Sequence, residues 1–192
     1  MNKQRLLLLV VVTSAMAGSW QVAQGAYIYA KAQLAQYLLA SAWQESRRTQ
    51  QPVKPWSWAD TWPVAKLEVS AHNIDLIVLA GDTGRTLAFG PGYNLASAKP
   101  GDIGNSIISA HRDTHFEFLQ QVKLNDEIVI ETQQGTRKKF TVKNIQIVDS
   151  RNATIPINDD MAMLTLVTCY PFDAIEAGGP LRYIVEAKEV SI

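Results

Sequence analysis

A cysteine and a histidine each follow a short apolar stretch of the kind that forms a buried strand. Cys169, the single cysteine of the chain, follows residues 164–168, and His111 follows residues 106–110. A thiol becomes an effective nucleophile when a neighbouring imidazole accepts its proton or stabilises the thiolate. Strand ends that meet loops are also where a rigid scaffold presents reactive side chains. The two residues are therefore candidates for a nucleophile and its general acid or base.

Acyl transfer by a thiolate also needs a group that stabilises the oxyanion formed on the attacked carbonyl. Arg182 is the candidate, because it stands near the start of the apolar segment 181–187, one loop after Cys169. An arginine in such a strand is unfavourable unless it faces a cleft or a partner. Thr168, which directly precedes the cysteine, is a candidate for lining the oxyanion site.

Each of these residues also has a purely structural interpretation. A free cysteine is usually a small buried hydrophobe, Thr168 could simply pack at its strand end, and Arg182 could pair with Glu186. His115 lies four residues after His111, but the pair lacks the acidic residue of a zinc-binding H-E-x-x-H motif. We expect His115 to be structural or to line the substrate groove. No Cys/His cluster has zinc-ligand spacing, and we expect neither a metal nor another cofactor.

Composition and charge narrow the class of protein. The 192 residues favour one globular domain with an extension, and 47% hydrophobic residues are enough for a sizeable core. Of 18 basic and 18 acidic residues, five and one lie within residues 1–50, so the remainder carries a net charge of −4. An acidic globular part argues against nucleic acid as a partner, because phosphate binding needs a basic face.

The first thirty residues indicate export across a membrane. Lys3 and Arg5 precede residues 6–30, which contain no charged side chain. A helix that crosses a bilayer needs about 20 mostly apolar residues, and its basic flank stays in the cytoplasm. The alternative is a cleaved signal peptide, since residues 15–17 fit the small-x-small cleavage pattern. We expect a single-pass protein of the bacterial inner membrane with a cytoplasmic N-terminus and a periplasmic catalytic domain.

The elements expected to position the reactive residues are short strands. Residues 31–48 have the apolar spacing of an amphipathic helix, and prolines then mark a linker. Eight segments of strand length follow, with one or two helical turns at 116–122; the strands are expected at 64–69, 74–79, 86–89, 106–110, 127–132, 138–148, 164–168 and 181–187. This mostly β pattern predicts a closed or nearly closed mixed β-barrel. We divide the chain into an anchor or signal peptide (1–30), a helix and linker (31–55) and a catalytic barrel (56–192).

The strings around the candidate residues resemble the sortase family, the cysteine transpeptidases of bacterial surfaces. Residues 165–169, Thr-Leu-Val-Thr-Cys, match the family's TLxTC signature, and Arg182 follows in GGPLRYIV. The string AHRDT around His111 is similar to the histidine motif, and the order His, Cys, Arg is the family's order. The longer strings HRDTHFEFL, TLVTCYPFDAIEAGGPLRY and KPWSWADTWPVAKL resemble the subgroup (class GN) of Gram-negative, largely marine, proteobacteria. The resemblance covers residues 56–190.

The resemblance implies an eight-stranded sortase-like barrel with Cys169 as nucleophile, His111 as general acid and base, and Arg182 as a clamp for the substrate and the oxyanion. It also implies a peptide substrate with an LPxTG-like C-terminal sorting signal, belonging to one dedicated surface protein. Cleavage after the threonine would give a thioester, which an amine then resolves; the sequence does not identify this amine. The alternatives are an exported cysteine hydrolase without an amine acceptor and a non-catalytic peptide-binding barrel.

Overall fold

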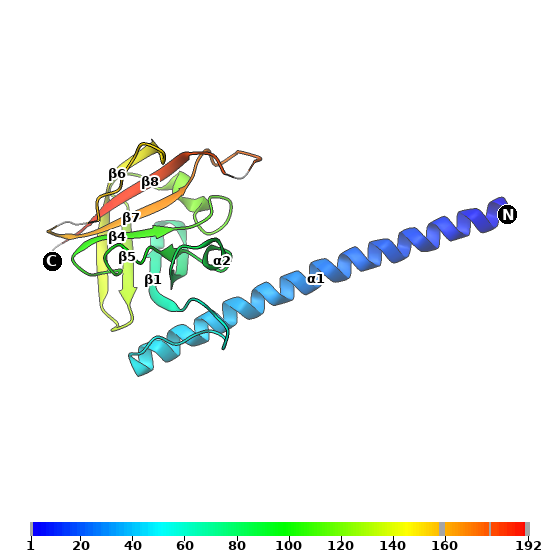
Figure 1. Cartoon of the computed structure of the whole chain (residues 1–192), viewed down its shortest axis with the longest axis horizontal. Coiled ribbons are helices and arrows are strands. Elements are labelled where there is room, and N and C mark those ends of the chain that lie inside the picture. Colours follow the sequence, from blue (N-terminus) through cyan, green and yellow to red (C-terminus); the bar gives the residue numbers. More distant parts are fainter. Residues whose placement is uncertain (1, 158–159, 177, 191–192) are drawn as a thin grey trace. The chain divides into compact units, whose positions relative to one another are not determined.

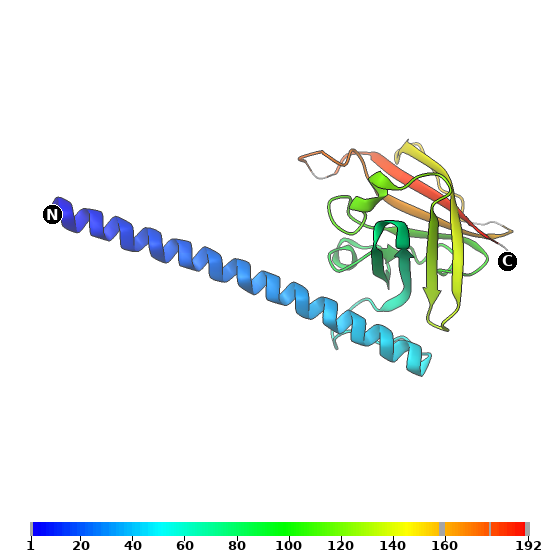
Figure 2. The same cartoon turned by 180° about the vertical axis from the view of Figure 1, so that it is seen from behind.

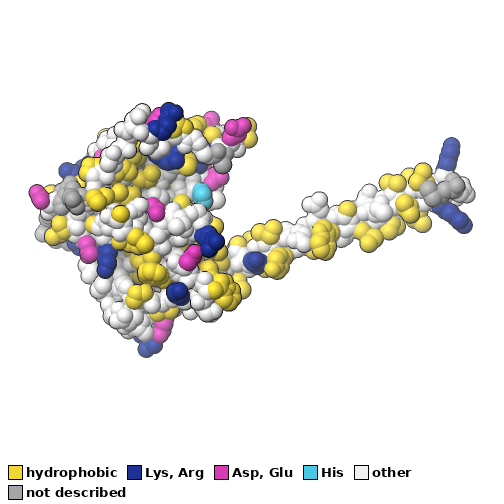
Figure 3. Space-filling model, viewed as in Figure 1, with side chains coloured by type: hydrophobic (Ala, Val, Ile, Leu, Met, Phe, Trp, Pro, Cys, Tyr) yellow, Lys and Arg dark blue, Asp and Glu magenta, His cyan; other side chains and the backbone are white. Residues whose placement is uncertain are grey.

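The N-terminal part of the chain is one long helix, α1 (Lys3–Thr49). The computed structural model describes residues 2–157, 160–176 and 178–190, and backbone contacts divide the chain into two units, Met1–Tyr37 and Leu38–Ile192. The expected anchor and the expected amphipathic segment belong to this single helix. In the first unit, apolar side chains cover much of the surface of α1, and basic side chains lie at the N-terminal end of the helix (Figure 3). Among the described helices, α1 alone is long and apolar enough to cross a membrane, a criterion that a signal sequence also meets.

The second unit is built around a closed β-barrel, which Figures 1 and 2 show from opposite sides. Its eight strands within the described residues are β1 (Pro63–Val69), β2 (Ile74–Ala80), β3 (Gly92–Tyr93), β4 (Gly104–Ser109), β5 (Glu127–Thr132), β6 (Arg137–Asp149), β7 (Ala162–Cys169) and β8 (Leu181–Glu189). They are hydrogen-bonded in the order β1-β2-β3-β4-β7-β8-β6-β5, and β1 pairs with β5 to close the barrel. The pairs β2–β3 and β4–β7 are parallel. The prediction of an eight-stranded mixed barrel is confirmed.

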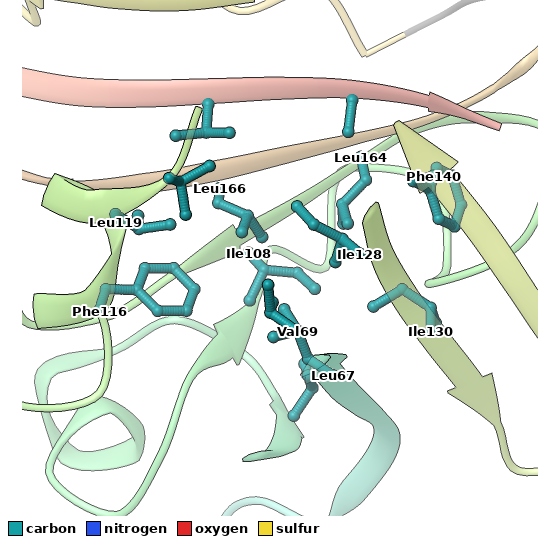
Figure 4. Packing of buried hydrophobic residues seen from close by; sticks show 14 of the residues in the cluster. Leu67, Val69, Ile108, Phe116, Leu119, Ile128, Ile130, Phe140, Leu164 and Leu166 are labelled. Atoms are coloured by element: carbon teal, nitrogen blue, oxygen red, sulfur yellow. The ribbon is translucent and has the colours of Figure 1, made fainter. Parts of the chain in front are cut away.

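Alternation along the strands explains why they form and where the core lies. In β1 every second side chain is buried, from Pro63 to Val69, because successive side chains of a strand point to opposite faces of the sheet. The inward side chains of all the longer strands form one hydrophobic cluster (Figure 4). Phe116 and Leu119 join it from the 3-10 helix η2 (Glu117–Gln121) and its N-cap, so the helical turns expected at 116–122 are present.

The prediction of a strand at residues 86–89 is wrong. These residues belong to a one-turn helix, α2 (Gly84–Leu87), and its following turn. The hydroxyl of Thr83 accepts the backbone N–H of Thr86 at 3.4 Å and caps the helix, a local bond that competes with strand formation. The missing strand is β3, which has only two residues and was too short to show alternation.

The last turns of α1, from residue 38 onward, pack within the same unit as the barrel. Leu39, Ala42 and Trp43 are buried. The side-chain amide of Gln133, in the turn between β5 and β6, donates to the carbonyl oxygen of Ser46 at 3.1 Å. It thereby satisfies a carbonyl that the helix end leaves without a partner. The end of the helix is therefore part of the folded domain, with both apolar and polar contacts to it.

Candidate active site

The alternation of β7 separates the nucleophile from the core. Leu164, Leu166 and Thr168 lie on its inward face and are buried. Cys169, the next residue, consequently lies on the outward face, where it is a free and partly exposed thiol. The interpretation of this cysteine as a fully buried hydrophobe therefore does not hold. A partly exposed thiol on the outside of the barrel is accessible to a substrate.

Arg182 lies directly across from Cys169. β7 and β8 are antiparallel, and the register pairs these two residues, whose side chains must then share one face at a Cβ separation of about 4.5–5.5 Å. One guanidinium nitrogen of Arg182, Nη1, donates to the carbonyl oxygens of Gly179 at 2.7 Å and Leu181 at 2.9 Å. Glu186, the expected alternative partner, instead accepts hydrogen bonds from two amide side chains of β6. Arg182 is thus a cation beside the thiol.

His111 reaches the same face from β4. β4 is parallel to β7 with Ser109 opposite Val167, and the N–H of Ala110 continues this pairing by donating to the carbonyl oxygen of Val167 at 3.2 Å. His111 follows Ala110 just beyond the end of β4, and Cys169 is the last residue of β7, so the two residues stand at the same end of neighbouring parallel strands. Since Ala110 is part of the core, the exposed side chain of His111 lies on the outward face. The strand geometry therefore brings the histidine, the cysteine and the arginine together.

Thr168 occupies the opposite face of β7. Its side chain is 2% exposed, and its hydroxyl donates to the carbonyl oxygen of Ala110 at 2.8 Å. The hydroxyl is therefore bonded to the residue that precedes His111. It lies inside the barrel, on the side away from the thiol.

His115 lies close to His111 in a compact turn. The N–H of Phe116 donates to the carbonyl oxygen of His111 at 3.0 Å, and the buried Phe116 ring fixes this turn on the core. Burial, followed by the proximity of His111, lowers the pKa of His115. In the part of the chain that the structure describes, no three side chains of His, Cys, Asp or Glu are grouped to hold a metal ion.

A further residue of this region, Arg112, was not singled out from the sequence. It is only 7% exposed, and its Nη2 donates to the carbonyl oxygens of Ala174 and Glu176, both at 2.8 Å. These carbonyls belong to the segment between β7 and β8, which begins directly after Cys169. Arg112 lies in the turn that follows His111, outside the strand, so no alternation in the sequence indicated its burial.

The comparison with protein families identifies this arrangement. The model of the sortase domain matches residues 67–190, a region that is more than half of the chain and includes all three outward-facing residues. The chain belongs to the sortase family. Sortase D of Bacillus subtilis (strain 168) is 30% identical over 126 residues, which are 65% of this chain and 63% of that relative. The aligned part is therefore less than two thirds of the relative's length.

Solved structures of sortases share the fold. A sortase D5 transpeptidase of Clostridium perfringens superimposes with a TM-score of 0.66 at 20% identity, covering 83% of this chain and 99% of the other. Sortase A of Corynebacterium diphtheriae gives a TM-score of 0.62 at 23% identity, covering 94% of this chain and 96% of the other. At this level of identity the likeness concerns the fold, and it includes the barrel that carries the candidate site.

Proposed function

We propose that this sortase is a cysteine transpeptidase in which Cys169 is the nucleophile, His111 the general acid and base, and Arg182 the group that binds the substrate carbonyl and its oxyanion. The observation that carries the proposal is the direct pairing of Cys169 with Arg182 across β7 and β8. It sets a permanent cation beside the only thiol of the chain, on the face that His111 also occupies. A guanidinium suits this role because it remains charged and offers several donors.

The proposed reaction has two acyl-transfer steps. His111 takes the thiol proton, and the thiolate attacks the carbonyl carbon of the scissile peptide bond. Arg182 stabilises the negative oxygen of the tetrahedral intermediate. His111 then returns the proton to the leaving amine, the C–N bond breaks and a thioester with Cys169 remains. An incoming amine attacks the thioester carbonyl and gives up a proton to His111. The C–S bond breaks as the amide forms, and His111 passes the proton to the sulfur, which restores the free thiol.

Thr168 contributes in two ways in this proposal, through its main chain beside the thiol and through its hydroxyl inside the barrel. Its hydroxyl is bonded to Ala110 inside the barrel, so only its main chain is available beside the thiol. The hydrogen bond keeps the strands that carry His111 and Cys169 at a fixed offset. Positioning of this kind matters because small displacements of reacting groups reduce rates strongly.

The substrate proposed is a peptide with an LPxTG-like C-terminal sorting signal, and its source is one dedicated surface protein. The strings HRDTHFEFL and TLVTCYPFDAIEAGGPLRY support the assignment to the Gram-negative subgroup. α1 would anchor the enzyme in the inner membrane, with the N-terminus in the cytoplasm and the barrel in the periplasm; the basic residues before the apolar stretch support this orientation. Genes that neighbour this one should encode a protein with such a signal, an apolar segment and a basic tail.

Cleavage of a sorting-signal peptide by the full chain in detergent tests the proposal. Cys169→Ala should abolish cleavage and leave the melting temperature unchanged, whereas undiminished cleavage would exclude the thioester route. Adding an amine should divert the acyl group into an amide product. Hydrolysis without any amide product would instead favour the hydrolase. A folded protein that binds the peptide, never cleaves it and has an inert thiol would be the non-catalytic module.

A further inference from the structure

Arg112 carries a buried positive charge whose hydrogen-bond partners are backbone carbonyls. Among the described residues, its Nη2 donates to the carbonyl oxygens of Ala174 and Glu176, and its Nη1 is buried with no hydrogen-bond partner. A buried ion held by carbonyls and an unfilled donor is less favourable than an apolar side chain of similar size. The cost of this arrangement calls for a role beyond packing.

The segment that Arg112 holds begins and ends at the reactive residues. Tyr170 follows Cys169 and its N–H donates to the carbonyl oxygen of Leu181 at 3.1 Å, which closes the base of the segment beside the Cys169–Arg182 pair. Tyr170 and Phe172 pack against the ring of Tyr183, with centroids 6.2 and 5.1 Å from it. The base is therefore held by aromatic contacts, and the outer part by the guanidinium of Arg112.

Between the two carbonyls bonded to Arg112 stands an isoleucine with no protein surroundings. Ile175 is 102% exposed, whereas Arg112, which binds the carbonyl oxygens of its two neighbours, is 7% exposed. A single exposed apolar side chain is common on protein surfaces and needs no explanation by itself. Here, however, the residues on both sides of Ile175 are held through their carbonyl oxygens by a buried cation, so the backbone near Ile175 is fixed while its side chain stays free.

We propose that Arg112 is a positioning residue that fixes the segment between β7 and β8, and that Ile175 is the apolar contact which this segment offers to the peptide substrate beside Cys169. Burying an isoleucine on peptide binding is worth roughly tenfold or more in affinity. Holding the backbone in advance avoids the loss of freedom that a mobile segment would suffer on binding. The inference rests on the proposed transpeptidase function.

Three variants of the full chain separate these roles. Arg112→Met removes the two hydrogen bonds and keeps the length of the side chain, while Ile175→Ser removes the apolar contact alone. Leu124→Ser is the matched control, since Leu124 is another exposed apolar residue at 58% exposure and lies in a different loop. We expect Ile175→Ser to raise KM for the peptide roughly tenfold at constant kcat, and Leu124→Ser to change neither parameter.

The double variant decides whether Arg112 acts through Ile175. In the Arg112→Met background, the further change Ile175→Ser should add little to the rise in KM, because the contact is already lost. Independent, additive effects would overturn the proposal. Arg112→Lys should raise KM less than Arg112→Met does, since an ammonium group can still donate hydrogen bonds. It should not restore the parent KM fully, because it lacks the fixed planar donors of a guanidinium.

Amide hydrogen exchange gives a readout that does not depend on the reaction. Exchange in residues 170–176 should become faster in Arg112→Met than in the parent chain, while exchange in the barrel strands stays the same. Unchanged exchange would exclude the positioning role even in an active enzyme. If exchange becomes faster but the parent chain cleaves no sorting-signal peptide, the positioning role of Arg112 is supported. The proposed transpeptidase function and the role of Ile175 in substrate binding would then be wrong.

Discussion

The hydroxyl of Thr168 and the carbonyl oxygen of Ala110 are joined by a hydrogen bond of 2.8 Å inside the barrel. The bond links β7 to the end of β4, and the next residue along each chain is a proposed member of the active site, Cys169 in one case and His111 in the other. The relative position of the histidine and the cysteine therefore depends on an interaction that neither of them makes.

Replacing Thr168 by valine tests this dependence. The change keeps the shape of the side chain but leaves the buried carbonyl of Ala110 without its donor, which should lower the free energy of unfolding by about 1–3 kcal/mol and reduce kcat/KM. Thr168→Ser retains the hydroxyl and serves as the control, and it should keep most of the activity. Denaturant unfolding and peptide cleavage measure the two effects. Equal activity of the valine and threonine forms would show that the bond does not position the histidine.

The guanidinium of Arg182 should be needed for chemistry more than for folding. Arg182→Lys keeps the charge but loses the planar set of donors, and removing one oxyanion donor lowers kcat by about 10²–10³. Glu186→Gln is the control, because Glu186 lies on the same strand and face and accepts its hydrogen bonds from Asn144 and Gln146. Single-turnover cleavage should slow only in the Arg182 variant. A similar loss in both variants would point to a general effect on β8.

The lowered pKa of His115 predicts a dependence of stability on pH. Its folded pKa lies below the ordinary value of 6.5 because of burial and the proximity of His111. The unfolded chain therefore binds the proton more readily, and the free energy of unfolding should fall as the pH decreases from above 6.5 through the folded pKa. His115→Gln should flatten the pH dependence in that window. Stability curves of the two forms that remain parallel would contradict this assignment.

Substitution by alanine should have opposite effects on stability at two glycines in neighbouring segments. A Cβ at Gly92 would lie 2.3 Å from the carbonyl oxygen of Gly81, whereas one at Gly84 meets nothing within 4 Å. Gly92→Ala must therefore displace the backbone of β3, and we expect a loss of at least 1–3 kcal/mol. Gly84→Ala in helix α2 should be neutral or stabilising by about 0.4–1 kcal/mol. Thermal unfolding of both variants provides the comparison, and similar melting temperatures would refute the close approach.

The end of α1 should contribute to the stability of the barrel. Trp43 is 6% exposed, within the same unit as the strands, so Trp43→Ala should destabilise that unit by roughly 3 kcal/mol or more. Gln44, the next residue, is exposed, and Gln44→Ala is the control. Denaturant unfolding of the full chain measures both. An unaltered midpoint in Trp43→Ala would mean that the barrel folds without help from the helix.

Much of the barrel was predictable because its strands alternate clearly between buried and exposed positions. The segments that contain β1, β2, β4 and β5 to β8 were all identified within a few residues. β3 was not, since two residues cannot show a period, and its pairing with β2 follows from a close backbone approach at Gly92 rather than from any side chain. The apolar pattern of residues 86–89 predicts a strand, because that pattern contains no information on the capping bond from Thr83.

The site was predictable in its members but not in its geometry. Cys169, His111 and Arg182 were chosen from residue type, order and family resemblance. Their common face depends on the registers of β4 with β7 and β7 with β8, which are tertiary properties. Arg112 was overlooked because charged residues are expected at the surface, and its carbonyl partners lie more than sixty positions away in the chain.

The one-residue step between Thr168 and Cys169 has a consequence for how this protein can change. Substitutions on the outside of β7 and β8 can alter reactivity or specificity without disturbing the packed interior, so the surface can diversify while the barrel is maintained. Insertions and deletions are a different matter. Adding or removing a single residue within β7 would exchange the two faces, turning the thiol inward and the threonine outward. The protein should therefore tolerate many replacements on the outward face of this strand and hardly any change in the strand's length.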